Sequence, residues 1–201
     1  MNYPDALFNA FMYPLEAVKL ASVRRRLLPE ASGDVLEIGA GTGTNLAYYD
    51  PERVRSLTLT DIGLTALLPD RALEFRERAG LRDGQVRLRE ADAHALPFAD
   101  ESFDTVVATL VLCSVRDQDL VLGELRRTLR RGGRLIFIEH VRPPGAIAHL
   151  VDFVNPVWHA ATGECNIDRD TGSAIERAGF TYRTRQRSGA GFLTHGVALR
   201  S

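Results

Sequence analysis

The run DVLEIGAGTG at residues 34–43 limits the possible fold of this chain more than any other segment. An apolar stretch leads to Glu37, and glycines follow at positions 39, 41 and 43. Because glycine has no Cβ, the main chain here can turn sharply and approach a ligand closely. Such a loop can wrap around a nucleoside-bearing molecule, while Glu37 adds a charge where the strand ends. The run therefore predicts a site for a small-molecule cofactor.

The composition limits the class of protein. The chain has 201 residues, of which 45% are apolar and 25% charged. This size and mixture are typical of one globular domain, here residues 1–201. The formal net charge is -1, whereas proteins that bind a phosphate backbone are usually strongly basic. We therefore expect no nucleic-acid partner.

The two cysteines, Cys113 and Cys165, lie far apart in the sequence. Their spacing supports neither a disulfide framework nor a zinc site, so we predict no metal and expect reduced thiols in a cytoplasmic protein. The apolar N-terminal residues are interrupted by Asp5, Asn9 and Glu16. These interruptions leave no run long enough for a membrane span or a signal peptide.

After the first 32 residues, strand-like apolar runs alternate with helical patterns, which indicates parallel strands joined by crossover helices. The periodicity predicts a helix over Asp117–Arg131 that ends at Gly132–Gly133. Its predicted buried face carries Leu120, Leu125 and Leu129. Five strands are predicted, at Asp34–Ile38, Ser56–Asp61, Gln85–Glu90, Phe103–Thr109 and Arg134–Val141. This alternation favours an open, doubly wound α/β sheet.

The C-terminal residues follow a different pattern. Two alternating runs, Thr181–Arg187 and Phe192–Arg200, are joined by the glycine-containing segment Ser188–Gly191, which predicts an antiparallel hairpin. A helix is expected before it, over Asp168–Ala178, with Gly179 at its end. With this hairpin the predicted sheet has seven strands, mostly parallel, and an antiparallel C-terminal end.

Two segments lie outside the alternation. Pro4–Leu28 predicts one or two amphipathic helices, and we interpret residues 1–32 as a helical cap that packs on the sheet or crosses its ligand edge. Residues 142–167 follow the fifth predicted strand, where a crossover connection can widen into a cover. We interpret them as a lid or substrate segment.

Two other kinds of nucleotide-binding loop are excluded by spacing. A phosphate-binding P-loop needs a lysine directly after its glycines, but the one lysine of the chain is Lys19. A dinucleotide fingerprint needs a glycine at its sixth position. That position holds Thr44 when counted from Gly39 and Leu46 when counted from Gly41. A nicotinamide oxidoreductase is therefore disfavoured.

The remaining pattern, ExGxGxG at Glu37, Gly39, Gly41 and Gly43, resembles the class I S-adenosylmethionine-dependent methyltransferases, which have a Rossmann-like sheet. The resemblance implies that the loop wraps the amino-acid and ribose parts of S-adenosylmethionine, and that Asp61 accepts both ribose hydroxyls. It further implies that Asp92 and Ala93 contact the adenine, and that Thr109 and Leu110 contact the methionine part of the cofactor. The implied cofactor residues are Glu37, Gly39, Ala40, Gly41, Gly43, Asn45, Asp61, Ile62, Asp92, Ala93, Thr109 and Leu110.

Three later runs sharpen this resemblance. TLVLCSV at Thr109–Val115, EHV at Glu139–Val141 and PVWHAATGECNIDRD at Pro156–Asp170 resemble the type 11 branch that contains alkyl thiol methyltransferases. The GCN motif of that branch has an inserted Glu164 here. More distantly, the chain resembles quinone-ring C-methyltransferases and phospholipid N-methyltransferases.

The resemblance implies methyl transfer to a small apolar acceptor, with a thiol first and a quinone carbon or an amine as alternatives. Positioning the sulfonium methyl in line with the acceptor supplies most of the acceleration. A thiol with a pKa of about 8.5 is partly ionised at neutral pH, so a nearby histidine would help without being obligatory. His140 and His159 are the candidates for orienting or deprotonating the acceptor. Cys113 and Cys165 are interpreted as buried, inert thiols.

A second class of function is a cofactor-binding protein without turnover, although the glycine loop shows no sign of decay. The expected partner is a small-molecule methyl acceptor. Peripheral membrane contact through the N-terminal helices is left open, as is the choice between a monomer and a homodimer.

Overall fold

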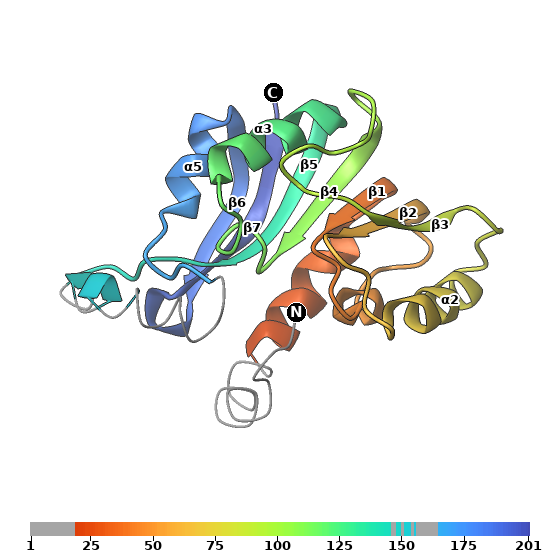
Figure 1. The fold of residues 1–201 in the computed structure, drawn as a ribbon, viewed down its shortest axis with the longest axis horizontal. Helices are drawn as coiled ribbons and strands as arrows, with labels where there is room; N and C mark the ends of the chain where they lie inside the picture. Colours follow the sequence, from red (N-terminus) through yellow and green to blue (C-terminus); the bar gives the residue numbers. More distant parts are fainter. Residues whose placement is uncertain (1–18, 146–147, 150, 154, 156–164) are drawn as a thin grey trace.

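The computed structural model describes residues 19–145, 148–149, 151–153, 155 and 165–201. Its strands are β1 Gly33–Ile38, β2 Val54–Asp61, β3 Val86–Glu90, β4 Phe103–Thr109, β5 Leu129–His140, β6 Phe180–Ser188 and β7 Leu193–Arg200. They form one sheet in the order β3-β2-β1-β4-β5-β7-β6 (Figure 1). The strands β1 to β5 pair in parallel, and β7 pairs antiparallel with both β5 and β6. The predicted doubly wound, mostly parallel sheet with an antiparallel C-terminal hairpin is confirmed.

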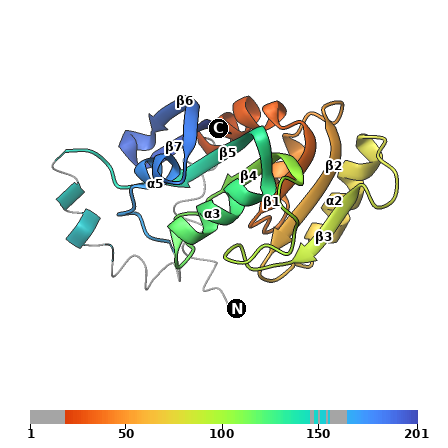
Figure 2. The same cartoon turned by 90° about the horizontal axis from the view of Figure 1, so that it is seen from above.

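Helices cover both faces of this sheet. Among the described residues, 19–27, 148–149, 151–153 and 155 are helical, and three further helices are α2 Leu68–Arg78, α3 Gln118–Thr128 and α5 Thr171–Arg177. Short 3-10 turns occur at η1 Leu28–Glu30, η2 Thr44–Ala47 and η3 Gly189–Gly191. α3 and α5 begin at aspartates, Asp117 and Asp170, whose carboxylates accept main-chain N–H groups of the first turn. Figure 2 shows α3 and the N-terminal helix on opposite sides of the sheet.

The central strands are buried on both faces, and successive residues contribute to two different cores. Val107 and Ile136 face a core shared with residues 19–27 and α2. Val106 and Phe137 face a second core shared with α3 and α5. This alternation follows from the two-residue repeat of a strand, and it explains why the central strands read as nearly continuous apolar runs.

Helix α3 differs from its prediction at its C-terminal end. It stops at Thr128, and Leu129 already pairs with Phe103 as the first residue of β5. Gly132 and Gly133, expected to end the helix, lie inside β5 at a register irregularity, where Gly132 adopts a φ of +72°. Leu129 is buried although it belongs to the strand. The helical spacing of apolar residues therefore extends beyond the true end of α3.

The predicted buried face of α3 is also partly wrong. Leu120 is 51% exposed, whereas Val121, Leu122 and Leu125 are fully buried. The apolar residues 120–122 are consecutive, so periodicity alone does not decide which of them faces the sheet.

The N-terminal helix predicted within Pro4–Leu28 is confirmed over residues 19–27, and the earlier part of that range lies outside the described residues. Leu20, Val23 and Leu27 bury its inner face. Among the described residues, no helix has both the length and the hydrophobicity needed to span a bilayer.

Candidate functional site

The predicted cofactor residues gather at one edge of the sheet. The glycine loop follows β1, Asp61 ends β2, and Thr109 ends β4. Because these strands are parallel, their carboxyl ends meet at the same edge. The chain turns in opposite directions from β1 and β4, which makes this edge the switch point where open α/β sheets usually bind ligands.

The glycine loop needs its glycines for two different reasons. Gly39, Gly41 and Gly43 all have a positive φ, from +53° to +77°. A Cβ on Gly39 would lie 2.2 Å from Val111 Cγ2, so packing excludes a side chain there. A Cβ on Gly41 would meet nothing within 4 Å. The bare main chain at Gly41 therefore faces open space where a ligand can approach.

Asp61 is tied to this loop. Its Oδ2 accepts a hydrogen bond from the Gly41 N–H at 2.8 Å, and the Thr65 hydroxyl donates to the Gly41 carbonyl at 2.8 Å. The next residue, Ile62, is 67% exposed. Asp61 thus fixes the loop at the same edge that presents an apolar side chain to solvent.

Asn45 connects three parts of the site from a buried position. Its Nδ2 donates to Glu37 Oε1 at 2.9 Å and to Thr109 Oγ1 at 3.1 Å. Its Oδ1 accepts from Arg24 Nε at 2.8 Å. The glycine loop, the end of β4 and the N-terminal helix are thereby joined through one side chain.

Glu37 lies beneath the loop. It is buried, and its Oε2 accepts a hydrogen bond from the Tyr49 hydroxyl at 2.5 Å. Burial raises the pKa of Glu37 to about 7, although the hydrogen bonds from Tyr49 and Asn45 act in the opposite direction. Its observed contacts are with protein groups that support the loop from below, so direct contact with a cofactor stays a prediction.

The carboxylate of Asp92 is held by His94, a residue for which the sequence predicted no role. Asp92 Oδ1 accepts from the His94 main-chain N–H at 2.9 Å and lies 2.6 Å from His94 Nδ1. These bonds lower the pKa of Asp92. The Asp117 N–H donates to His94 Nε2 at 3.2 Å, which places the imidazole proton on Nδ1. The Asp-x-His spacing of an Asx turn is the signal that would have revealed this contact.

The loop after β4 is held by a buried carboxylate whose role the sequence pattern did not reveal. Leu110, a predicted cofactor residue, has a φ of +57°, which is rare for a side chain of its size. Glu139 in β5 accepts the N–H groups of the next three residues, at 3.0 to 3.1 Å. Burial raises the pKa of Glu139.

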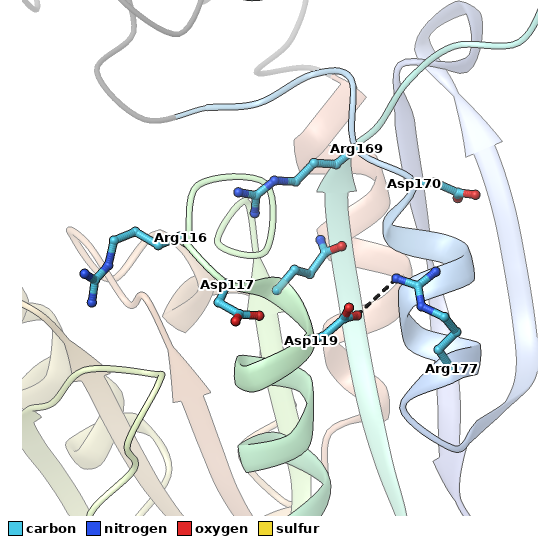
Figure 3. A pocket seen from close by; sticks show the side chains of 7 residues that line it. Arg116, Asp117, Asp119, Arg169, Asp170 and Arg177 are labelled. Atoms are coloured by element: carbon cyan, nitrogen blue, oxygen red, sulfur yellow. Dashed lines mark hydrogen bonds and ion pairs between the residues drawn. The ribbon is translucent and has the colours of Figure 1, made fainter.

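Arg169 holds the same loop from the other side. It donates to the carbonyls of Leu112 at 2.7 Å and Val115 at 2.5 Å. Figure 3 shows Arg169 beside a surface pocket that is also lined by Arg116, Asp117, Gln118, Asp119, Asp170 and Arg177. Arg177 and Asp119 form an ion pair across this pocket at 3.1 Å. These polar groups join the loop to α3 and α5.

The two cysteines lie close together in the structure. Cys165 Sγ lies 3.7 Å from Cys113 Sγ and 3.5 Å from Nδ1 of His140. The contact with Cys165 and burial raise the pKa of the buried Cys113 thiol. The sequence offered no signal for this cluster because parallel strands bring distant residues together. The other predicted catalytic residue, His159, lies outside the described residues.

A family model described as a methyltransferase domain matches residues 36–137. The match begins in β1 and ends in β5, so it contains the glycine loop, Asp61, Asp92 and Thr109. The chain belongs to this methyltransferase family. It is an S-adenosylmethionine-dependent methyltransferase, and the predicted resemblance is confirmed.

Curated relatives agree with this assignment. The human thiol S-methyltransferase TMT1A is 33% identical over 178 residues, which cover 81% of this chain and 69% of that protein. Human TMT1B is 36% identical over 193 residues, which cover 89% of this chain and 75% of that protein. Phosphatidylethanolamine N-methyltransferase of Cereibacter sphaeroides is 35% identical over 148 residues, covering 69% and 70%.

Solved structures confirm the fold. Geranyl diphosphate methyltransferase in complex with S-adenosylmethionine superposes with a TM-score of 0.68 at 17% identity, covering 96% of this chain and 88% of that one. The [4+2]-cyclase SpnF superposes with a TM-score of 0.65 at 20% identity, covering 88% and 61%. At these identities the likeness establishes the Rossmann-like fold alone.

Proposed function

We propose that this enzyme transfers the methyl group of S-adenosylmethionine to the sulfur of a small, apolar thiol. The observation that carries the choice of acceptor is the extent of similarity. The two human thiol S-methyltransferases match over 81% and 89% of the chain. The phosphatidylethanolamine enzyme matches over 69%, and demethylmenaquinone methyltransferase of Thermus thermophilus over 62% at 37% identity.

In this proposal the main chain of residues 39–43 lies against the cofactor, and Asp61 accepts the ribose hydroxyls. Open space at Gly41 supports the first contact, and the bond from Gly41 to Asp61 supports the second because it orients the carboxylate in advance. The exposed Ile62 offers an apolar surface for the adenine. The proposed cofactor residues are Glu37, Gly39, Ala40, Gly41, Gly43, Asn45, Asp61, Ile62, Asp92, Ala93, Thr109 and Leu110.

Bound S-adenosylmethionine supplies a methyl group on a sulfonium, and the protein orients the acceptor thiolate in line with it. Because orientation provides most of the acceleration, this transfer needs no metal. We propose His159 as the group that orients or deprotonates the thiol. His140, the other candidate predicted from the sequence, contacts Cys165, because its Nδ1 lies 3.5 Å from Cys165 Sγ.

We propose residues 142–167 as the acceptor segment of a single domain, with the N-terminal residues 1–32 as its helical cap. Phe153 in this segment is 81% exposed, so its ring is available for contact with an apolar acceptor. The contact between Arg24 and Asn45 supports a place for the cap beside the cofactor loop.

The test uses the full chain with methyl-labelled S-adenosylmethionine and a panel of alkyl thiols, quinols and amines. We expect label in the thioether product and little in the other classes. Label in a quinone or amine product alone would replace the thiol with that acceptor. Tight binding of S-adenosylhomocysteine without turnover of any acceptor would favour a cofactor-binding protein. The His159→Ala variant should transfer more slowly at unchanged cofactor affinity, and a normal rate would remove His159 from the mechanism.

A further inference from the structure

Three side chains that commonly ligate metals meet at the carboxyl edge of the sheet. Cys113 lies in the loop after β4, His140 ends β5, and Cys165 precedes α5. Their ligand atoms all lie within 4.8 Å of one another, and within the part of the chain that the structure describes they form the one such group. We propose that Cys113, His140 and Cys165 bind a zinc ion.

The two separations from Cys165 match those of a tetrahedral zinc site. With Zn–S bonds of about 2.3 Å and Zn–N bonds of about 2.0 to 2.1 Å, two sulfur ligands stand about 3.8 Å apart, and a sulfur and a nitrogen about 3.5 Å apart. The sulfur atoms of Cys113 and Cys165 are 3.7 Å apart, and Cys165 Sγ is 3.5 Å from His140 Nδ1. Cys165 Sγ therefore stands at a suitable distance from both other ligand atoms, and all three atoms lie within 4.8 Å of one another.

Main-chain bonds hold the cysteines in this arrangement. The Cys113 N–H donates to Glu139 Oε2 at 3.1 Å, and the Cys113 carbonyl accepts the Asn166 N–H at 2.9 Å. The second bond joins the residue after Cys165 directly to Cys113. Because both ligand-bearing segments are fixed by the fold, little ordering is needed when an ion binds.

The ligand chemistry selects zinc or a similarly thiophilic ion. Two thiolates and an imidazole are typical zinc ligands, whereas magnesium and calcium prefer oxygen. Each thiol loses its proton to solvent on binding, so the two thiolate charges balance the charge of the divalent ion. A set of three protein ligands leaves the fourth tetrahedral position to water or another donor.

The position of the site indicates a structural role. In the proposed function, residues 142–167 form the acceptor segment; His140 lies just before it and Cys165 lies near its C-terminal end, so an ion bound to both would join its two ends. Cys113 connects these ends to the loop after β4, which begins at Leu110. The zinc ion would fix the base of the acceptor segment.

The first experiment titrates the full chain, reduced and freed of metal, with Zn²⁺ in competition with a chromophoric chelator. We expect one ion per chain, and thiolate-to-metal charge-transfer bands when Co²⁺ replaces Zn²⁺. Absence of binding, or bound Co²⁺ without those bands, would overturn the proposal. A chain oxidised to the Cys113–Cys165 disulfide should lose the binding, and unchanged binding in that form would also overturn it.

The second experiment compares variants. Cys165→Ser and His140→Ala should each weaken Zn²⁺ binding at least about 100-fold. His149→Ala, which removes an exposed histidine, is the matched control and should bind normally. Wild-type affinity in Cys165→Ser would refute the site. If a variant does not fold, as judged by circular dichroism, the Co²⁺ spectrum of the wild-type chain decides. None of these readouts depends on the methyl acceptor.

Discussion

At the scale of single residues, the glycine loop and Asp61 depend on each other. Gly41 has a φ of +53°, and its N–H is satisfied by Asp61 Oδ2 at 2.8 Å. The loop therefore keeps its shape because a carboxylate from the neighbouring strand holds it. A change at either residue affects both the loop and the proposed ribose contact.

Replacing Asp61 with alanine should weaken S-adenosylmethionine binding about 10- to 150-fold, or about 1.5 to 3 kcal/mol, because a charged acceptor is lost. Isothermal titration calorimetry measures this loss. Asp70→Ala, which removes an exposed carboxylate on α2, is the control and should bind like the wild type. Equal affinities in the two variants would remove Asp61 from the cofactor site.

Glu37 should make stability fall as pH rises from about 4.5 to about 7. Its pKa is about 7 in the folded chain and about 4.5 when unfolded. Between these values the unfolded chain is ionised while the folded chain keeps its proton, so each rise in pH favours unfolding. Urea denaturation from pH 5 to 8 should show this slope in the wild type and a smaller one in Glu37→Gln. Parallel profiles would contradict the raised pKa.

At the scale of elements, the loop after β4 is the part of the site with the most specific support. Glu139 accepts three consecutive N–H groups of this loop, and Arg169 donates to two of its carbonyls. This support explains how Leu110 can keep a φ of +57°. The loop connects the methionine end of the proposed cofactor site to Cys113.

Replacing Glu139 with alanine should lower the free energy of unfolding by about 3 kcal/mol or more, because buried N–H groups lose their acceptor. Urea denaturation at neutral pH measures the loss. The control Glu77→Ala changes an exposed glutamate on α2 and should have little effect. A stability of Glu139→Ala equal to that of the control would contradict the role of this carboxylate.

The sequence predicted the elements better than their ends. The five parallel strands and the hairpin were predictable because apolar runs and turn residues are local signals. The end of α3 was not, because pairing between Leu129 and Phe103 overrides the helical pattern. The role of Glu139 was hidden because its partners are separated from it by 26 to 28 residues of sequence.

At the scale of the whole molecule, the two edges of the sheet have different functions. The carboxyl edge carries the site, whereas the amino ends of β1 and β4 carry an ion-pair cluster. Asp34 accepts from Arg55 and Arg130, and Asp104 pairs with the same two arginines. These bonds, chiefly the one from Arg55, lower the pKa of Asp34 to about 2. The cluster joins strands that are far apart in the sequence.

Asp34 should therefore contribute to stability above pH 3.8, its ordinary pKa, and lose this contribution as pH falls through about 2. Asp34→Asn should be less stable than the wild type by about 1 kcal/mol at pH 7, since Arg55 is largely exposed. The difference should shrink between pH 4 and pH 2 in denaturant titrations. A constant difference over this range would contradict the ion-pair account.

Across the whole chain, the predicted cofactor residues follow the carboxyl ends of parallel strands, and these ends lie at one edge of the sheet. The order of the residues in the sequence was therefore enough to predict that they lie at the same edge. The cysteine cluster shows the opposite case. Cys113 and Cys165 are 52 residues apart, and a sequence pattern that looks for short ligand spacings misses them. Contacts between segments that are distant in the sequence can be identified only from the folded structure.

The most direct test of the account is calorimetric titration of S-adenosylhomocysteine into Gly41→Leu and Gly80→Leu. Both glycines have a similar positive φ, +53° and +61°, and a Cβ on either meets nothing within 4 Å. The two substitutions should therefore strain the backbone alike, but a side chain at Gly41 should fill the proposed cofactor space. We predict that Gly41→Leu loses at least about 100-fold in affinity while Gly80→Leu binds normally. Wild-type affinity in a folded Gly41→Leu variant would contradict the placement of the cofactor on this loop.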